Sequence, residues 1–255
     1  MNLVIDIGNS FAKYAVVEQG KTLFQHTAAT LDRTAVDTLL EQYPAVDRSI
    51  LATTRLSDPA LEQHLEQRTG HLLRFTASTP VPLRNRYATP ETLGADRLAA
   101  AVGAWDMVPN RELLIIDLGS ALTIDRVSAA GEYLGGNISP GLAMRYAALH
   151  RMTGRLPQCQ PPTGPLALTG TDTRQAIESG VARGMLHEIE GYIARFGEKN
   201  TPPTLFFTGR DANFFAEKVK NPIFVIHDLV LRGLNRILEY NAIQPDRQHT
   251  GLRAR

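Results

Sequence analysis

The chain of 255 residues has one cysteine, almost no net charge and no long run of apolar residues. Because a disulfide needs two thiols, the single Cys159 excludes an intramolecular disulfide framework and any all-cysteine metal site. The formal net charge of +1 gives no electrostatic reason to expect nucleic acid as a partner. No apolar stretch reaches the roughly 18 residues that a membrane-spanning helix needs, so we expect no membrane partner.

The first six residues have no basic segment and include an acid within their apolar run, which is not the pattern of a signal peptide. Hydrophobic residues make up 43% and charged residues 21%, the balance of a globular protein with a sizeable core. These features predict a cytoplasmic protein. The length allows one large domain or two of ordinary size.

A pattern of apolar strand, acid, glycine turn and second strand occurs twice in the chain. The first copy contains Asp6 and Gly8, and the second contains Asp117 and Gly119, an offset of 111 residues (117 − 6). The copies align without a gap as far as a second turn at Gly20 in the first copy and at residue 131 in the second. One copy in each half indicates a gene duplication, so we expect two domains, residues 1–112 and 113–255.

Strands that alternate with helices predict an α/β fold. Because each half begins with an apparent β-hairpin, we expect mixed sheets. Apolar spacing and breaker residues predict helices over 33–43, 58–70, 93–105, 174–195, 211–219 and 229–240. The glycine-rich segment 135–141 is predicted to be a loop, with a helix starting near Leu142.

Asp6 and Asp117 each end an apolar strand, where a carboxylate is costly unless it meets water, a cation or a hydrogen-bond donor. The glycine two residues later allows a tight turn and the close approach of a ligand. The polar residues that follow add hydroxyl and N–H groups, a combination suited to phosphate, and Lys13 would add a positive charge. An ordinary Asp/Gly/Asn turn explains either copy alone equally well, but it explains both together less well. There is no Walker A motif and no G-x-G-x-x-G motif, so P-loop and dinucleotide sites are unsupported.

The segment Gly94-Ala95-Asp96-Arg97 opens a helix rich in small residues. Since the helix dipole alone favours an acid in the first turn, this segment taken by itself fits a structural role better than a catalytic one. The preceding residues 87–93 are not typical of simple helix capping, which favours a functional role.

Together these segments resemble the motifs of type III pantothenate kinases. The resemblance lies in the following stretches: Asp6-Ile7-Gly8-Asn9-Ser10 with Lys13; Asn85, Tyr87, Pro90 and Leu93 to Arg97; Asp117-Leu118-Gly119-Ser120-Ala121-Leu122-Thr123; Gly135 to Gly141; Thr173 to Gly180; and Thr208-Gly209. They occur in the order of the family's motifs. The chain departs from the family's pattern at Ser10, Ser120 and Leu122, where threonine is usual, and at Arg210, where a second glycine is usual.

The resemblance implies an actin/hexokinase-like fold of two ribonuclease-H-like halves with a nucleotide in the cleft. It implies transfer of the γ-phosphoryl group of ATP to the primary hydroxyl of pantothenate, the first step of coenzyme A synthesis. It further implies Mg²⁺, a monovalent cation (K⁺ or NH₄⁺), and a homodimer with the active site near the subunit interface.

Residue roles follow from the same resemblance. Asp96 would be the catalytic base, Asp6 would lie near Mg²⁺, and Asp117 would bind the monovalent cation. The ATP phosphates would be held by Asp6, Ile7, Gly8, Asn9, Ser10, Phe11, Ala12, Lys13 and Ser120. Pantothenate would be held by Tyr87, Gly94, Ala95, Asp96, Arg97 and Thr173.

Two alternatives stay open at this point. One is another kinase or a phosphatase of the same fold, against which the segment from Tyr87 to Arg97 argues. The other is a regulatory protein that assists transcription, which the near-neutral charge and the retained acids disfavour. Cys159 has no basic neighbour in sequence, so we do not expect a catalytic thiol. Arg145 lies on a predicted helix, where we expect a solvated face.

Overall fold

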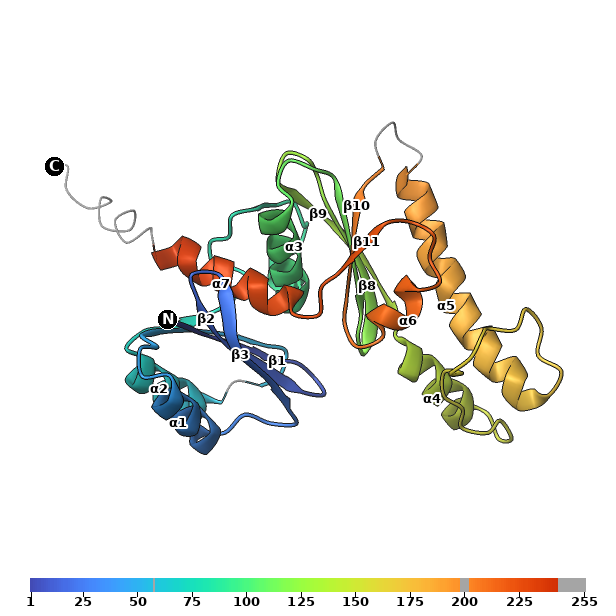
Figure 1. Cartoon of the computed structure of the whole chain (residues 1–255), viewed down its shortest axis with the longest axis horizontal. Helices are drawn as coiled ribbons and strands as arrows, with labels where there is room; N and C mark the ends of the chain where they lie inside the picture. Colours follow the sequence, from blue (N-terminus) through green and yellow to red (C-terminus); the bar gives the residue numbers. More distant parts are fainter. Residues whose placement is uncertain (57, 198–201, 243–255) are drawn as a thin grey trace. The chain divides into compact units, whose positions relative to one another are not determined.

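The structure is a computed structural model that describes residues 1–56, 58–197 and 202–242. By the contacts among its residues the chain forms two compact units (Figure 1). Among the described residues, the first unit contains those of Met1–Pro109, Gly131–Tyr133 and 228–242, and the second contains Asn110–Ala130, 134–197 and 202–227. These units are defined by contacts within the fold, which do not test where the duplicated halves meet in the sequence. The boundary between residues 112 and 113 therefore stays a prediction.

The first unit contains a five-stranded mixed sheet in the order β3-β2-β1-β4-β5. Its strands are β1 (Asn2–Ile7), β2 (Ala12–Glu18), β3 (Lys21–Ala28), β4 (Arg48–Thr53) and β5 (Leu72–Arg74). The pairs β1–β2 and β2–β3 are antiparallel, whereas β1–β4 and β4–β5 are parallel. The predicted hairpin and the mixed sheet are therefore confirmed.

Helices cover both faces of this sheet. α1 (Arg33–Gln42) and α2 (Pro59–Thr69) pack on one face, where Leu3 and Ile5 of β1 join their apolar residues in a core. α7 (Leu229–Ala242) contacts β1 and β4 on the other face, together with α3 (Ala95–Met107). Figure 1 shows the two helix pairs on opposite sides of the strands. Because successive side chains of a strand point to opposite faces of the sheet, Asp6, which follows Ile5, lies on the face away from α1 and α2.

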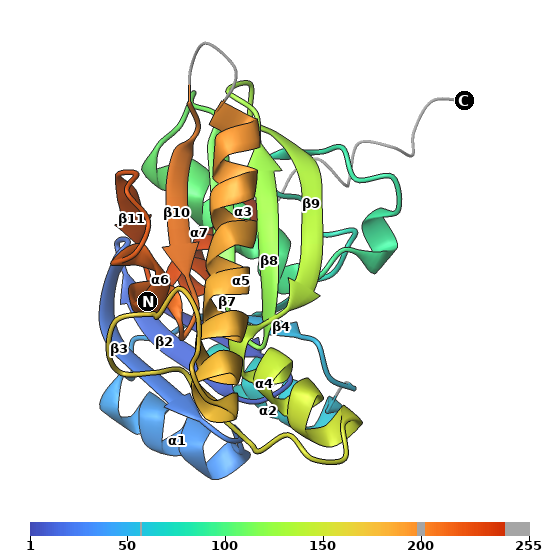
Figure 2. The ribbon, with the colours of Figure 1, turned by 90° about the vertical axis from the view of Figure 1, so that its right-hand side faces the viewer.

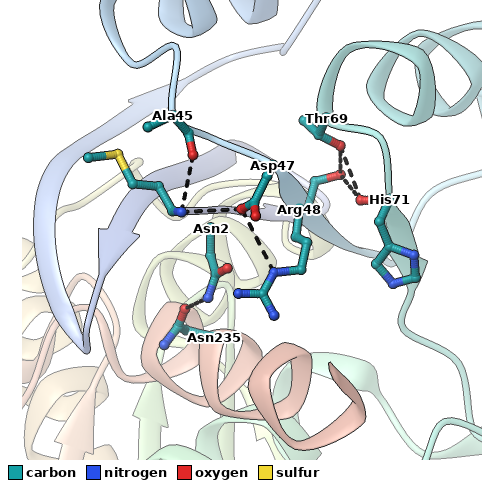
Figure 3. Close-up of polar contacts among 9 residues, drawn as sticks. Asn2, Ala45, Asp47, Arg48, Thr69, His71 and Asn235 are labelled. Carbon is teal, nitrogen blue, oxygen red and sulfur yellow. Dashed lines mark hydrogen bonds and ion pairs between the residues drawn. The ribbon is translucent and has the colours of Figure 1, made fainter. Parts of the chain in front are cut away.

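A buried polar contact joins α7 to the start of β1. The amide nitrogen of Asn2 donates to Oδ1 of Asn235 over 2.8 Å, and both side chains are buried (Figure 3). On β4, the hydroxyl of Ser49 lies 2.9 Å from that of Thr69 at the end of α2. Since unmet polar groups are costly in a protein interior, these bonds fix the position of each helix on the sheet.

α3 and α7 cross closely because each has a glycine at the contact. A Cβ atom at Gly233 would lie 1.8 Å from the carbonyl oxygen of Ala99, and one at Gly103 would lie 2.5 Å from that of Leu229. Both clashes involve helix backbone, which cannot yield as a flexible side chain can.

We therefore expect Gly233→Ala to lower the free energy of unfolding by at least about 1–3 kcal/mol, the range for overpacked cores. Gly191→Ala on the long helix α5 is the matched control, because a Cβ there has nothing within 4 Å. The control should be neutral or slightly stabilising, by about 0.5–1 kcal/mol. Urea unfolding of both variants measures the difference, and equal midpoints would contradict the close crossing.

The second unit repeats the strand order of the first. β7 (Leu113–Leu118), β8 (Ala121–Val127), β9 (Glu132–Pro140), β10 (Thr204–Thr208) and β11 (Ile223–Val225) are arranged β9-β8-β7-β10-β11. β7 is antiparallel to β8 and parallel to β10, as β1 is to β2 and β4. The duplication recognised in the sequence thus extends to the topology of both sheets.

The predicted loop at 135–141 is wrong, because β9 continues as a strand to Pro140. Gly135 has φ +91°, and a Cβ at Gly136 would lie 2.0 Å from the carbonyl oxygen of Ile124 on β8. The glycines therefore allow two backbones to approach closely within a sheet. The start of β9, Glu132 and Tyr133, belongs to the first unit and pairs there with β6 (Arg84–Asn85).

Helices of the second unit pack on its sheet. α5 (Thr173–Gly197) runs along the strands with α4 (Leu142–Met152) beside one end (Figure 2), and α6 (Ala212–Ala216) follows β10. Met185 and Ile189 of α5 share a core with Ile116 and Phe207. The predicted helices near 142, 174–195 and 229–240 are confirmed, whereas that at 211–219 is shorter. Within the described residues, no helix is both long and apolar enough to cross a membrane.

Candidate active site

The first acid-and-glycine turn joins β1 to β2. Asp6 is 8% exposed and lies opposite Lys13 in the antiparallel register. The amide of Gly8 donates to the carbonyl of Phe11 over 3.0 Å, which closes the turn. The strand register therefore puts the predicted cation beside the predicted acid.

Three of the predicted site residues interact through their charges. The pKa of Asp6 is raised from 3.8 to about 6, chiefly by burial and further by the charge of Asp96, against which the charge of Lys13 acts in the lowering direction. Asp96 is ninety residues away in sequence (96 − 6), yet the first unit brings it near the turn. A buried carboxyl group that lies near both a second carboxylate and a lysine is an arrangement typical of functional sites.

Asp96 lies in the first turn of α3. Its Oδ1 accepts a hydrogen bond from the amide of Arg97 over 2.9 Å, and a Cβ at Gly94 would lie 2.6 Å from that oxygen. Glycine at 94 thus leaves the carboxylate room to occupy this position.

Arg97 and Tyr87 lie together in the first unit. Arg97 is only 5% exposed, and its guanidinium lies 5.8 Å from the centre of the Tyr87 ring. The side chain of Asn85 accepts from the amide of Tyr87 over 2.9 Å, and the ring of the fully buried Tyr133 lies 6.3 Å from that of Tyr87. The segment from Asn85 to Arg97 therefore forms one packed group.

Two residues near these groups, Arg55 and Tyr133, were not predicted from the sequence. Arg55 follows β4 and donates from Nη2 to the carbonyl of Asn9 over 2.9 Å, which brings a cation to the first turn. Tyr133 supports Tyr87 from the start of β9. A basic residue just after the parallel neighbour of β1 is the only hint that a sequence could give for Arg55.

The second acid-and-glycine turn ends β7. Asp117 lies between Thr123 of β8 and Thr208 of β10 in the two registers. A Cβ would lie 3.0 Å from its Oδ1 at Gly119 and 2.5 Å at Gly209, where φ is +90°. Both glycines thus let the backbone lie close against the carboxylate. The amide of Gly119 donates to the carbonyl of Ala121 and closes the turn.

Arg210 does not strain the backbone. In the described part of the chain only Gln19 and Asn110 combine a side chain with positive φ, so position 210 does not require glycine. Arg210 instead lines a cavity of about 430 Å³ together with residues of α4, residues 158–161 and Asp211. The amide of Asp211 donates to the carbonyl of Leu118, so this cavity adjoins the second turn.

The two turns fit the cations differently. Mg²⁺ commonly binds one or two carboxylates plus phosphates and waters, which suits the single buried carboxylate of Asp6. At Asp117, the carboxylate and the carbonyl oxygen of Leu118 both lie beside Gly209, so the donors there are oxygen atoms, as a monovalent cation would need. No group of three or more His, Cys, Asp or Glu side chains able to hold a metal occurs among the described residues.

The remaining predicted site residues have a position but no tested role. Thr173 is exposed and begins α5 in the second unit, and Ser120 is exposed in the second turn. The other predicted residues lie in or beside the first turn or at the start of α3. They are Ile7, Asn9, Ser10, Phe11, Ala12 and Ala95. Their contacts with ligands stay predictions.

Comparison with known proteins agrees with these features. Residues 2–195 match the family described as type III pantothenate kinase. A type III pantothenate kinase of Phocaeicola vulgatus is 43% identical over 244 residues, covering 94% of this chain and 99% of that protein. One from Porphyromonas gingivalis strain W83 is 43% identical over 242 residues, covering 94% and 98%.

Solved structures share the fold. A Campylobacter jejuni protein assigned to a Baf family of transcriptional activators is 24% identical, with a TM-score of 0.62 over 94% of this chain and 99% of that chain. The activator of 2-hydroxyisocaproyl-CoA dehydratase from Clostridium difficile, solved with ADPNP, is 11% identical with a TM-score of 0.58 over 99% of both chains.

Proposed function

Because the chain belongs to the type III pantothenate kinase family, we propose that it phosphorylates the primary hydroxyl of pantothenate with ATP. The product would be 4′-phosphopantothenate, and the reaction would begin coenzyme A synthesis. The observation that carries this proposal beyond the family match is the interaction of Asp6 with Asp96, which come from two separate motifs. The regulatory alternative has no comparable support, since it leaves this costly pair of acids without a role.

Asp96 is the proposed general base. Its position in the first turn of α3, fixed by the amide of Arg97, leaves a carboxylate oxygen to orient the substrate hydroxyl. In a loose phosphoryl-transfer transition state the hydroxyl proton leaves late, so an ordinary carboxylate can accept it. Arg97 is proposed to bind the pantothenate carboxylate, because a guanidinium offers paired donors. Tyr87, Gly94, Ala95 and Thr173 complete the proposed pantothenate site.

Residues 6–13 and Ser120 are proposed to hold the phosphates of ATP. The amides of the first turn and Lys13 supply donors and positive charge there, with Arg55 as an added cation. Mg²⁺ near Asp6 would neutralise charge on the phosphates, and K⁺ or NH₄⁺ at Asp117 would supply a further fixed charge. The nucleoside is proposed to enter the cavity beside Arg210. We further propose that the protein is a cytoplasmic homodimer with pantothenate near the subunit interface.

Consumption of ATP on addition of pantothenate tests the proposal. We expect ATP turnover that depends on pantothenate and Mg²⁺, that falls when K⁺ is replaced by Na⁺, and that yields a phosphorylated product detectable by mass spectrometry. A pantothenate analogue lacking the primary hydroxyl is the matched control and should give no turnover. A regulator of transcription would consume no ATP in any of these mixtures, and another kinase of this fold would use a different acceptor.

A further inference from the structure

Arg145, Glu188 and Ser139 form a closed set of polar contacts in the second unit. Arg145 donates from Nε to the carbonyl of Pro140 over 2.7 Å and from Nη2 to the hydroxyl of Ser139 over 3.1 Å. The same Nη2 forms an ion pair with Glu188. The hydroxyl of Ser139 donates to Oε1 of Glu188 over 2.6 Å. Each of the three side chains therefore contacts the other two, contrary to the solvated face that was expected for Arg145.

These contacts tie together three elements. Ser139 and Pro140 end β9, Arg145 lies in the first turns of α4, and Glu188 lies in the middle of α5. The side chains of Arg145 and Glu188 are only 21% and 25% exposed. Charged hydrogen bonds screened from water are directional and stronger than those at the surface, so they fix the end of β9 more tightly than apolar contacts would.

The fixed segment packs directly against the second acid-and-glycine turn. The amide of Gly141 donates to the carbonyl of Ser120 over 3.2 Å, and the carbonyl of Gly141 accepts from the amide of Arg145 over 3.0 Å. A Cβ at Gly141 would lie 2.4 Å from the carbonyl oxygen of Ser120 and 2.5 Å from that of Gly119. No space is left for the turn to move toward β9, so the position of residues 140 and 141 sets that of the turn.

We propose that Arg145 and Glu188 are positioning residues that hold the Ser120 turn where it binds the phosphates of ATP. The proposal rests on the proposed kinase function, because it assigns a ligand to that turn. Neither residue has to touch the nucleotide. Loosening the contacts should therefore weaken ATP binding more than pantothenate binding, since most of the proposed pantothenate residues, Tyr87 and Gly94 to Arg97, lie in the first unit.

Glu188→Gln is the most direct test, because it keeps the size of the side chain and removes its charge. We expect the KM for ATP to rise by about tenfold, corresponding to the loss of one charge-assisted hydrogen bond. The KM for pantothenate should stay within about twofold, since of the proposed pantothenate residues only Thr173 lies in the second unit, 15 residues (188 − 173) before Glu188 on α5. Arg145→Lys, which keeps the charge but cannot reach all three acceptors at once, should have a similar effect.

Glu190→Gln is the matched control. Glu190 lies on the same helix two residues beyond Glu188, and it is exposed to solvent. This variant should keep both KM values. The double variant Arg145→Lys/Glu188→Gln should be little worse than either single variant, because residues that act as one unit are not additive.

Thermal unfolding first establishes that each variant is folded, and Ser139→Ala offers a second route if Arg145→Lys fails to fold. An unchanged KM for ATP in folded Glu188→Gln would overturn the proposal, and so would an equal rise in both KM values, which indicates general loosening. Calorimetric titration with Mg²⁺ and ATP gives the same comparison as Kd values without any turnover. If the wild type bound ATP but phosphorylated no pantothenate, the kinase proposal would fail while the positioning proposal could still be tested by these Kd values.

Discussion

Asp96→Asn should lower kcat by about 10²–10⁴-fold, the usual contribution of a general base. The amide has nearly the same size as the carboxylate, and its oxygen can still accept the bond from the amide of Arg97. It cannot, however, take up the proton of the substrate hydroxyl. The KM for pantothenate should change much less than kcat. Steady-state kinetics with pantothenate as the varied substrate measures both effects.

Asp106→Asn provides the matched control for this substitution. Asp106 lies on the same helix, is 54% exposed and pairs with Arg236 over 2.9 Å. This variant should keep kcat, and both variants should unfold within a few degrees of the wild type. Unchanged turnover in Asp96→Asn would show that Asp96 is not the base. Another residue would then have to orient the hydroxyl of pantothenate.

Asp6→Asn should produce a protein that is less active but more stable. Turnover should fall by about 10²–10³-fold, as when one electrostatic contact to a transition state is removed. Stability should rise at neutral pH because the native carboxylate is held, largely by burial, in a site that disfavours its charge. This opposition between stability and activity is expected of a buried acid retained for function.

The direction of the expected change in stability follows from how many protons the folded and unfolded states bind at each pH. The unfolded carboxyl titrates near 3.8 and the folded one near 6, so the folded protein binds more protons between these values. Its stability therefore falls as the pH rises through this interval and is level above it. In protein free of Mg²⁺ and nucleotide, Asp6→Asn removes that fall, a gain on the order of 2–3 kcal/mol above pH 7 that vanishes below pH 4.

Urea unfolding of the wild type and Asp6→Asn at pH 4.0 and pH 8.0 measures this difference, with Asp106→Asn as the control. The gain should appear only at the higher pH. A gain of equal size at both values would point to a packing effect of the amide, and a loss at pH 8.0 would show that the carboxylate is stabilised by its surroundings.

Much of the fold could be predicted because its signals are local. Apolar runs that end in an acid and a glycine mark β1 and β7, and the break at Gly20 marks the turn to the next strand. α2 begins with Pro59 and ends at Gly70 with φ +73°, as its sequence indicated. The predicted loop at 135–141 is wrong, because a sequence does not distinguish glycines that let two strands approach closely from glycines that form a loop.

The site was predictable where neighbours in sequence meet. Lys13 lies opposite Asp6 because a short hairpin fixes the register, and Asp96 opens its helix as the motif indicated. Arg55 and Tyr133 could not be found in this way, because they reach the site through the pairing of strands distant in sequence. Glu188 is likewise brought to Arg145 by the packing of α5, which no local pattern encodes.

The packing of α7 against α3 and the first sheet has a consequence for synthesis on the ribosome. The last strand of the sheet in the first unit ends at residue 74, but α7, which covers much of one face, begins only at Leu229. Until some 150 further residues have been made (229 − 74 = 155), only α3 can pack on that face, and the part that α7 covers stays exposed. Because such distant contacts form slowly, the nascent chain should depend on chaperones, and it should be most prone to aggregate just before α7 emerges.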